Sequence, residues 1–270
     1  PADKVDFAMA HGVWTWVDDT VRGQIVDALG RCLAPGALVY MGYNAAAVWS
    51  AADPIRQIFR AAPPGPPDAR YGPARRAVDG WLALNATQAP EAARLWDKLS
   101  SVSDDFLAHE LGSAHGTGIW PETLQAALAD AKLAYACPAI LPEALDALFL
   151  PDDALDWLRE GASTGWGETA RDLAHRRSFR TDLFHRGAPR LAGPERMAAM
   201  MGMRVAAWDS GPDVGGPGIP TDRLTRALPA GLRDALREAA GPEGRPLADV
   251  LSALDLDAEN GLQAALMALT

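Results

Sequence analysis

The first 44 residues alternate between apolar segments and an amphipathic helix, and this order restricts the fold more than any other feature. Residues 5–10 and 37–43 are almost wholly apolar, as expected for strands. Between them, Asp18 is a good helix N-cap, apolar positions then recur every three or four residues, and Pro35 ends the helix. Strand, helix, short loop, strand is the repeating unit of a parallel sheet, so we expect an α/β fold. Apolar strands of this kind need neighbours and cover on both sides.

The later segments fit the same kind of sheet. The chain begins with Pro1 and with a strand that has no earlier neighbour, so we expect it to hold the back half of a larger sheet. Residues 133–140 are predicted to form another strand, and apolar and polar side chains alternate in residues 178–186. A period of two indicates a strand with one solvent-exposed face, which we place at an edge of the sheet.

Two segments of different character interrupt and follow these strands. The prolines of residues 63–67 indicate a boundary, and the Ala-rich segment after them is predicted to be a helical insertion. Near the end of the chain, helices at about 221–240, 246–254 and 257–269 resemble those of a winged-helix domain. We therefore expect four parts: the first part of the core at 1–62, a helical regulatory insertion at 63–120, the last strands and helices of the core at 121–187, and a truncated, mostly helical, winged-helix-like domain at 188–270.

The composition excludes several classes of partner. Hydrophobic residues make up 49% of the 270 residues, and charged residues make up 22%. A formal net charge of -10 argues against a nucleic-acid partner, because phosphate binding needs a basic face. No apolar run approaches the roughly 20 residues of a membrane span. With Cys32 and Cys137 expected to be reduced, we predict a cytoplasmic protein with no membrane partner.

Four motifs together resemble a bacterial family. They are FAMAHGVWTWV at 7–17, LAPGALVYMGYN at 33–44, FLAHE at 106–110 and RRSFRTDL at 176–183. The first two are similar to the fourth and fifth strands of class I S-adenosylmethionine-dependent methyltransferases, in the subgroup that carries a methyltransferase regulatory domain. In that subgroup a strand ends in His-Gly-aromatic, and a Leu-x-Pro-Gly-Gly turn precedes a strand ending in Tyr-Asn. Here Ala37 replaces the second glycine, and the resemblance covers about residues 1–190.

The resemblance implies a partial Rossmann-like methyltransferase sheet, of which this chain holds strands four to seven, the seventh being antiparallel. It also implies methyl transfer from S-adenosylmethionine to an acceptor that is either a protein or a small molecule. The glycine-rich turn and the acidic residue that hold this cofactor in the family are absent from the sequence. We therefore expect S-adenosylmethionine to bind the full-length protein, whereas this chain alone is expected to bind it poorly and to be inactive.

Ligands of open parallel sheets bind beyond the carboxyl ends of the strands, and candidate residues follow both predicted ends here. The candidates are His11, Tyr43 and Asn44 for catalysis, and Gly12, Trp14 and Trp16 for cofactor binding. We expect His11 to accept a proton from the attacking nucleophile, and the aromatic pair to stack on adenine or close over the substrate. The structural alternatives are that the tryptophans cap the sheet and that His11 bonds a loop carbonyl.

Other functions stay open or are disfavoured. A non-catalytic regulatory or protein-interaction module is the alternative, because the cofactor-binding glycine motif is missing. His109, Glu110 and His115 lack the spacing that places two histidines on one helix face, so we expect no metal site. DNA binding is disfavoured because residues 257–267 contain no Lys or Arg. The exposed apolar edge of a half sheet is expected to be covered by a homodimer or by the chain's own helices.

Overall fold

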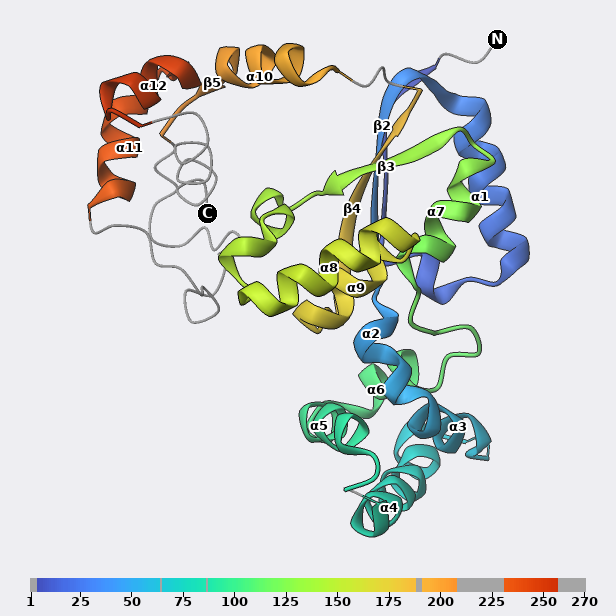
Figure 1. Ribbon diagram of the computed structural model, residues 1–270. Coiled ribbons are helices and arrows are strands. Elements are labelled where there is room, and N and C mark those ends of the chain that lie inside the picture. The colour runs from blue at the N-terminus through green and yellow to red at the C-terminus, as the bar shows by residue number, and fades with distance from the viewer. Residues whose placement is uncertain (1–3, 64, 86, 188–190, 208–230, 257–270) are drawn as a thin grey trace. The chain divides into compact units, whose positions relative to one another are not determined.

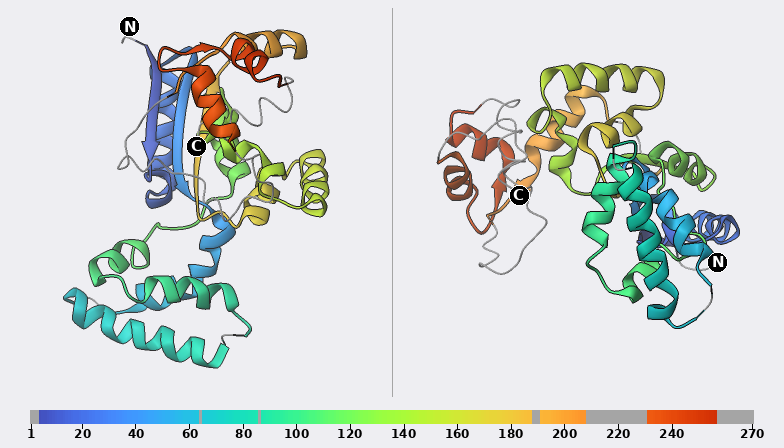
Figure 2. Two further views of the ribbon diagram at one scale, coloured as in Figure 1. Left: turned by 90° about the vertical axis from the view of Figure 1, so that its left-hand side faces the viewer. Right: turned by 90° about the horizontal axis from the view of Figure 1, so that it is seen from below.

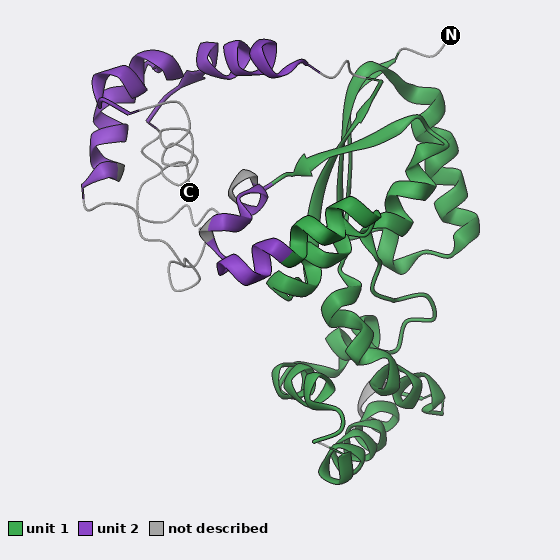
Figure 3. Ribbon diagram, viewed as in Figure 1, with its two compact units in different colours: residues 1–139, 157–187 green, residues 140–156, 188–270 purple. Residues whose placement is uncertain are grey.

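The computed structural model describes residues 4–63, 65–85, 87–187, 191–207 and 231–256 (Figure 1). The chain divides into two compact units (Figure 3). The first contains residues 1–139 and 157–187, and the second contains residues 140–156 and 188–270. The first unit combines a mixed sheet with helices, so the α/β fold class predicted from the sequence is confirmed.

The sheet of the first unit has four strands in the order β1-β2-β4-β3. They are β1 (Val5–His11), β2 (Leu33–Asn44), β3 (Leu133–Pro138) and β4 (Phe179–Arg186). β1 and β2 are parallel and are connected by α1 (Asp19–Cys32), which confirms the predicted strand–helix–strand unit. Asp18 caps this helix by accepting a hydrogen bond from the backbone N–H of Val21 at 2.8 Å. β4 is antiparallel to both β2 and β3.

One sequence-based expectation about this sheet is wrong. β4 lies between β2 and β3 rather than at an edge, whereas β1 is an edge strand of the described sheet, as expected for a half sheet. Every second residue of β4 is buried, namely Arg180, Asp182 and Phe184, and the two charged side chains of this set neutralise each other. β1 has one neighbouring strand, and its Phe7 and Met9 side chains are 56% and 68% exposed.

One face of the sheet is covered by helices. Figure 1 shows α1 and α7 (Pro121–Ala129) beside the sheet. Val26 of α1 and Leu124 of α7 pack against Val39 and Met41 of β2 in the core of the first unit. Because side chains alternate along a strand, the residues between these positions of β2 lie on the opposite face. Large apolar side chains of that face stay exposed, among them Phe7, Met9, Leu38 and Phe179. The sheet therefore has one covered face and one open, apolar face within this unit.

The chain between β2 and α7 is helical and has its own core, which includes side chains of residues 53–61 as well as of the insertion expected at 63–120. Its helices are α2 (Ala46–Trp49), α3 (Asp53–Ala61), α4 (Pro67–Asn85), α5 (Pro90–Leu99) and α6 (Asp104–Glu110), with a 3-10 turn at Ser50–Ala52. Figure 2 shows these helices grouped together. Ile55, Phe59 and Leu107 are among their fully buried side chains, so the group is held by apolar packing.

After β3, short 3-10 turns (Leu141–Ala144 and Asp146–Leu148) lead to α8 (Asp152–Thr164), and α9 (Gly167–His175) precedes β4. The second unit contains α10 (Gly193–Gly202), β5 (Arg204–Val205), α11 (Leu232–Ala240), β6 (Arg245–Pro246) and α12 (Leu247–Ala253).

The part of the second unit that the structure describes has a small core in which Leu236 and Ala240 pack against Val250. The winged-helix-like organisation stays a prediction, because the helix expected at 257–269 lies outside the described residues. In the described parts of the chain, no helix combines the length and the apolar character that a membrane span needs.

Candidate functional site

The ends of β1 and β2 are adjacent, as expected for parallel strands, and both carry candidate residues. His11 is the last residue of β1 and is exposed. Its Nδ1 atom lies 3.0 Å from the hydroxyl oxygen of Tyr40, and its ring centroid lies 5.1 Å from that of Phe179. The imidazole is therefore held on the open face of the sheet with one of its two ring nitrogens engaged.

Gly12 makes the turn that follows β1. Its φ of +69° lies in the left-handed region that favours glycine, and its N–H donates to the carbonyl oxygen of Gly42 at 2.8 Å. This turn leads into a 3-10 turn at Trp14–Trp16. Gly12 thus shapes the backbone at the strand end, and its contact with a cofactor stays a prediction.

The two tryptophans of this loop lie in different environments. Trp14 is 3% exposed and belongs to the core of the first unit, where its carbonyl accepts a hydrogen bond from Arg22 at 3.1 Å. Trp16 is partly buried and its ring centroid lies 4.3 Å from that of His109. A Cβ added to Gly116 would lie 2.4 Å from the Trp16 ring. Trp14 therefore anchors the loop in the core and Trp16 anchors it against the helical segment. Cofactor contacts by either ring stay a prediction.

Asn44 ends β2 and is 8% exposed. Its backbone N–H donates to the hydroxyl of Thr15 at 3.0 Å, and its carbonyl accepts from the N–H of Ile119 at 2.9 Å. Its side-chain Nδ2 has no hydrogen-bond partner among the described residues. A buried amide donor without a partner is uncommon in folded proteins, and the role of Asn44 in a site stays a prediction.

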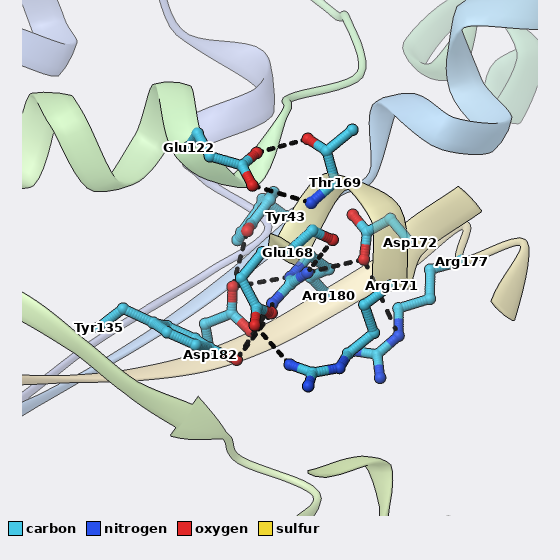
Figure 4. Close-up of polar contacts among 10 residues, drawn as sticks. All are labelled: Tyr43, Glu122, Tyr135, Glu168, Thr169, Arg171, Asp172, Arg177, Arg180 and Asp182. Carbon is cyan, nitrogen blue, oxygen red and sulfur yellow. Dashed lines mark hydrogen bonds and ion pairs between the residues drawn. The ribbon is translucent and has the colours of Figure 1, made fainter. Parts of the chain in front are cut away.

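Tyr43 lies on the other face of β2 from His11, and the structure does not bring these two residues together. It is fully buried, and its hydroxyl donates to Asp182 at 2.7 Å (Figure 4). Burial, and then the neighbouring Asp182 carboxylate, raise the pKa of Tyr43 far above its usual range. The hydroxyl is therefore neutral and belongs to a buried polar network.

Arg180 lies at the centre of this network and is fully buried. Its guanidinium contacts three carboxylates: Asp182 at 2.8 Å, Asp172 at 2.7 Å and Glu168 at 2.7 Å. Glu168 and Asp172 are four residues apart on α9, and Arg180 and Asp182 are two apart on β4. These spacings put each pair on one face of its element, so the helix and the strand meet through charged groups.

The carboxylates of the network differ in protonation. Burial raises the pKa of Asp172 to about 6, although Arg180 and Arg177 act in the opposite direction. Burial also acts to raise the pKa of Glu168, but Arg171 and Arg180 lie against it and hold the pKa below its ordinary value. The hydroxyl of Tyr135 donates to Glu168 at 3.1 Å. Asp172 therefore titrates within an accessible pH range while Glu168 stays ionised.

Sequence reasoning missed this network. The signal for it was present in the alternation of residues 178–186 and in the four-residue spacing of Glu168 and Asp172. The alternation of residues 178–186 does not tell whether the polar or the apolar side chains face the core. The prediction from the sequence placed the polar side chains in solvent. The network links α9 to β4 and, through Tyr43, to β2 next to its last residue, Asn44, so we regard it as support for the site.

Arg60 of α3 holds the segment against which Trp16 packs. Arg60 donates from Nε to the carbonyl of Ser113 and from Nη2 to the carbonyl of Gly116, both at 2.8 Å. Arg56 is 1% exposed and its guanidinium carbon lies 5.2 Å from the ring centroid of Trp49.

Among the described residues, no three or more His, Cys, Asp or Glu side chains are arranged to hold a metal ion.

Comparison with known proteins identifies the class to which this fold belongs. Residues 103–186 match a family model described as "Predicted methyltransferase regulatory domain". A solved structure of PKMT2 from Rickettsia typhi is similar, with a TM-score of 0.59 and 18% identity, over 96% of this chain and 54% of that chain. A second PKMT2 structure, in complex with AdoHcy, has a TM-score of 0.59 and 17% identity, over 97% and 55% of the two chains. The chain thus has a fold similar to that of these methyltransferase structures, and its residues 103–186 match the regulatory-domain model, which confirms the resemblance seen in the sequence.

Two relatives are similar in sequence. Uncharacterized protein sll1526 of Synechocystis sp. is 27% identical over 209 residues, which are 75% of this chain and 41% of that protein. Uncharacterized protein RP028 of Rickettsia prowazekii is 31% identical over 56 residues, which are 21% of this chain and 22% of that protein. The chain spans about half the length of the solved PKMT2 structures. The matched range 103–186 runs from α6 through β4 and so includes Arg180 and its carboxylate partners.

Proposed function

We propose that this chain is the acceptor-binding and regulatory part of a class I S-adenosylmethionine-dependent methyltransferase. In this proposal β1, β2, β3 and β4 are strands four, five, six and seven of the catalytic sheet. The observation that carries the proposal is the strand arrangement: β1 and β2 are parallel, and the last strand of the sheet in sequence, β4, is antiparallel. The family resemblance implies the same directions for these strands.

The open face of the sheet supports the view that more of the protein completes it. Phe7, Met9, Leu38 and Phe179 are all at least 38% exposed and lie on this face. An apolar face of this kind, next to the unpaired edge of β1, is typical of a surface that another segment covers. We propose that the remaining half of the protein pairs with β1, covers these side chains and supplies the cofactor site. A homodimer is the competing occupant, and light scattering of the complete protein distinguishes the two.

The residues of this chain do not by themselves fit S-adenosylmethionine. A cradle for its methionine and ribose groups needs glycines that let the backbone approach the ligand at a helix N-terminus. In the described chain, β1 is followed by the single glycine Gly12, and β2 continues through Ala45 into α2 without a glycine. We therefore assign the cofactor cradle to the rest of the protein and the acceptor side to this chain.

The residues of this chain act on the methyl acceptor in our proposal. Nδ1 of His11 is engaged by Tyr40, which leaves Nε2 to take the proton that the acceptor loses as it attacks. The unpartnered amide of Asn44 provides a hydrogen-bond donor at the adjacent strand end. In this proposal, the rest of the rate acceleration comes from orienting the acceptor and excluding water.

Calorimetric titration with AdoHcy tests the proposal. We expect the complete protein to bind AdoHcy saturably and this chain alone to show no saturable binding. His11→Ala in the complete protein is expected to keep AdoHcy binding and to lower methyl transfer about 100-fold or more, which is the usual range for loss of a general base. If the complete protein does not bind AdoHcy, the chain is instead a non-catalytic interaction module.

A further inference from the structure

The imidazole of His11 is confined by residues from two other strands. Its Nδ1 lies 3.0 Å from the Tyr40 hydroxyl oxygen, and the two rings are close to parallel, with centroids 5.8 Å apart and planes 21° apart. The ring of Phe179 lies on another side, at a centroid distance of 5.1 Å and an angle of 53°. β2 contributes Tyr40 and β4 contributes Phe179, so the ring orientation depends on the register of the sheet.

Gly42 provides the space in which the imidazole lies. It is opposite His11 in the register of β1 and β2, and a Cβ at this position would lie 2.6 Å from Nδ1 of His11. The same Cβ would lie 3.2 Å from Cζ of Phe179. Glycine inside a strand weakens it and often marks a place where another group approaches the backbone closely. Here the approaching group is the His11 ring.

We propose that Tyr40 is a positioning residue that accepts a hydrogen bond from Nδ1–H of His11 and so keeps Nε2 of His11 unprotonated, ready to take the proton of the methyl acceptor. This inference rests on the function proposed for His11. A neutral imidazole carries its proton on one nitrogen only, so an Nδ1–H donated to Tyr40 leaves a lone pair on Nε2. When Nε2 takes the proton, Nδ1–H still donates to the same oxygen, and Tyr40 does not have to reorient.

The state of the Tyr40 hydroxyl agrees with this role. Burial is the main cause that raises the pKa of Tyr40 above its usual value, and Thr181 acts in the opposite direction. The phenol is therefore neutral at ordinary pH, and its oxygen is available as an acceptor. Phe179 has no polar atom to offer and serves only to limit the rotation of the His11 ring.

Nitrogen NMR of the full chain with labelled histidine tests the tautomer directly. The chain has five histidines, and His11→Gln assigns the His11 signals. We expect the Nδ1–H form for His11, and a shift toward the Nε2–H form in Tyr40→Phe, which keeps the ring and removes the acceptor oxygen. Tyr71→Phe makes the same chemical change in α4, where Tyr71 stacks on Phe59, and is expected to leave the His11 signals unchanged. An Nε2–H form in the unaltered chain, or no change in Tyr40→Phe, overturns the inference.

Methyl transfer by the complete protein gives the second readout. We expect Tyr40→Phe to lower kcat about 10-fold with KM unchanged, and Gly42→Ala, which displaces the His11 ring, to lower kcat about 100-fold. In the His11→Ala background, Tyr40→Phe is expected to have no further effect, because its action passes through His11. An equal loss in both backgrounds overturns the inference. If His11→Ala leaves kcat unchanged, the proposed role of His11 fails, while the tautomer experiment still decides how Tyr40 holds it.

Discussion

Tyr43 donates a 2.7 Å hydrogen bond to Asp182, and these two buried residues are 139 positions apart in the sequence. The bond joins β2 to β4, and the same carboxylate contacts Arg180 at 2.8 Å. Arg180 also contacts Asp172 and Glu168 of α9, so one guanidinium connects the sheet to this helix. The sheet therefore depends on a charge network as well as on its apolar core.

Removal of the central cation is expected to destabilise the first unit strongly. Arg180→Met leaves three buried or partly buried carboxylates without their shared partner, and breaking a buried ion pair in this way typically costs about 3–5 kcal/mol. Urea unfolding monitored by circular dichroism measures the loss. The matched control is Arg94→Met, because Arg94 pairs with Glu91 in an exposed position and such pairs contribute about 0–1 kcal/mol. Equal effects of the two substitutions would contradict a structural role for the network.

Asp172 is expected to make stability depend on pH. Its pKa is about 6 in the folded chain and 3.8 in the reference state, so the folded state binds the proton more tightly. The contribution of Asp172 to the free energy of unfolding therefore falls as pH rises from about 4 to about 6, by up to about 3 kcal/mol. Above that range the contribution is constant.

Asp172→Asn provides the reference for that measurement. The difference in free energy of unfolding between the unaltered chain and Asp172→Asn is expected to fall steadily between pH 4 and pH 6. Because the pKa of Glu168 is lowered in the folded chain, its contribution to the free energy of unfolding changes with pH in the opposite direction. Glu168 is present in both proteins, so this contribution is part of both curves. A difference that is independent of pH, or that rises with pH, would show that Asp172 is not held as a protonated group.

The contact of Trp16 with Gly116 is expected to be sensitive to a single methyl group. In Gly116→Ala the new Cβ would lie 2.4 Å from the Trp16 ring, so the loop after β1 must move. Overpacking of this kind typically costs about 1–3 kcal/mol. The ring protons of His109, whose centroid is 4.3 Å from that of Trp16, report the movement through their NMR shifts.

Gly80→Ala is the control for this substitution. Gly80 lies within α4 and a Cβ there would meet no atom within 4 Å, so alanine is expected to stabilise the helix by up to about 1 kcal/mol. The His109 shifts should not change. A stable Gly116→Ala protein with unchanged His109 shifts would mean that the Trp16 contact does not hold the loop.

Much of the fold follows from local patterns in the sequence. The apolar runs at 5–10 and 37–43, with an amphipathic helix between them, predict the parallel pair of β1 and β2. The helical character of the chain between β2 and α7 follows from its periodicity and its lack of strand-like segments. These features depend on neighbours in the sequence, which is why they can be predicted from it.

The position of β4 and the buried network depend on contacts between distant residues. The alternation in β4 has the same period whether the polar side chains face water or face each other, so it does not reveal that Arg180 and Asp182 are buried. The pairing of Arg180 with α9 depends on how the strand and helix pack. Among the candidate residues, His11 ends β1 opposite Gly42 and Asn44 ends β2 two residues later, while the side chain of Tyr43 lies on the opposite face because side chains alternate along a strand.

The most direct test of the account is the response of His11 to AdoHcy in the complete protein. With labelled histidine and His11→Gln for assignment, the ring signals of His11 are followed as AdoHcy is added. The account predicts a saturable change at His11 with the same concentration dependence as the heat of binding, because β1 ends beside the reacting groups. Saturable heat with no change at His11 would contradict it, since AdoHcy would then bind away from the ends of β1 and β2.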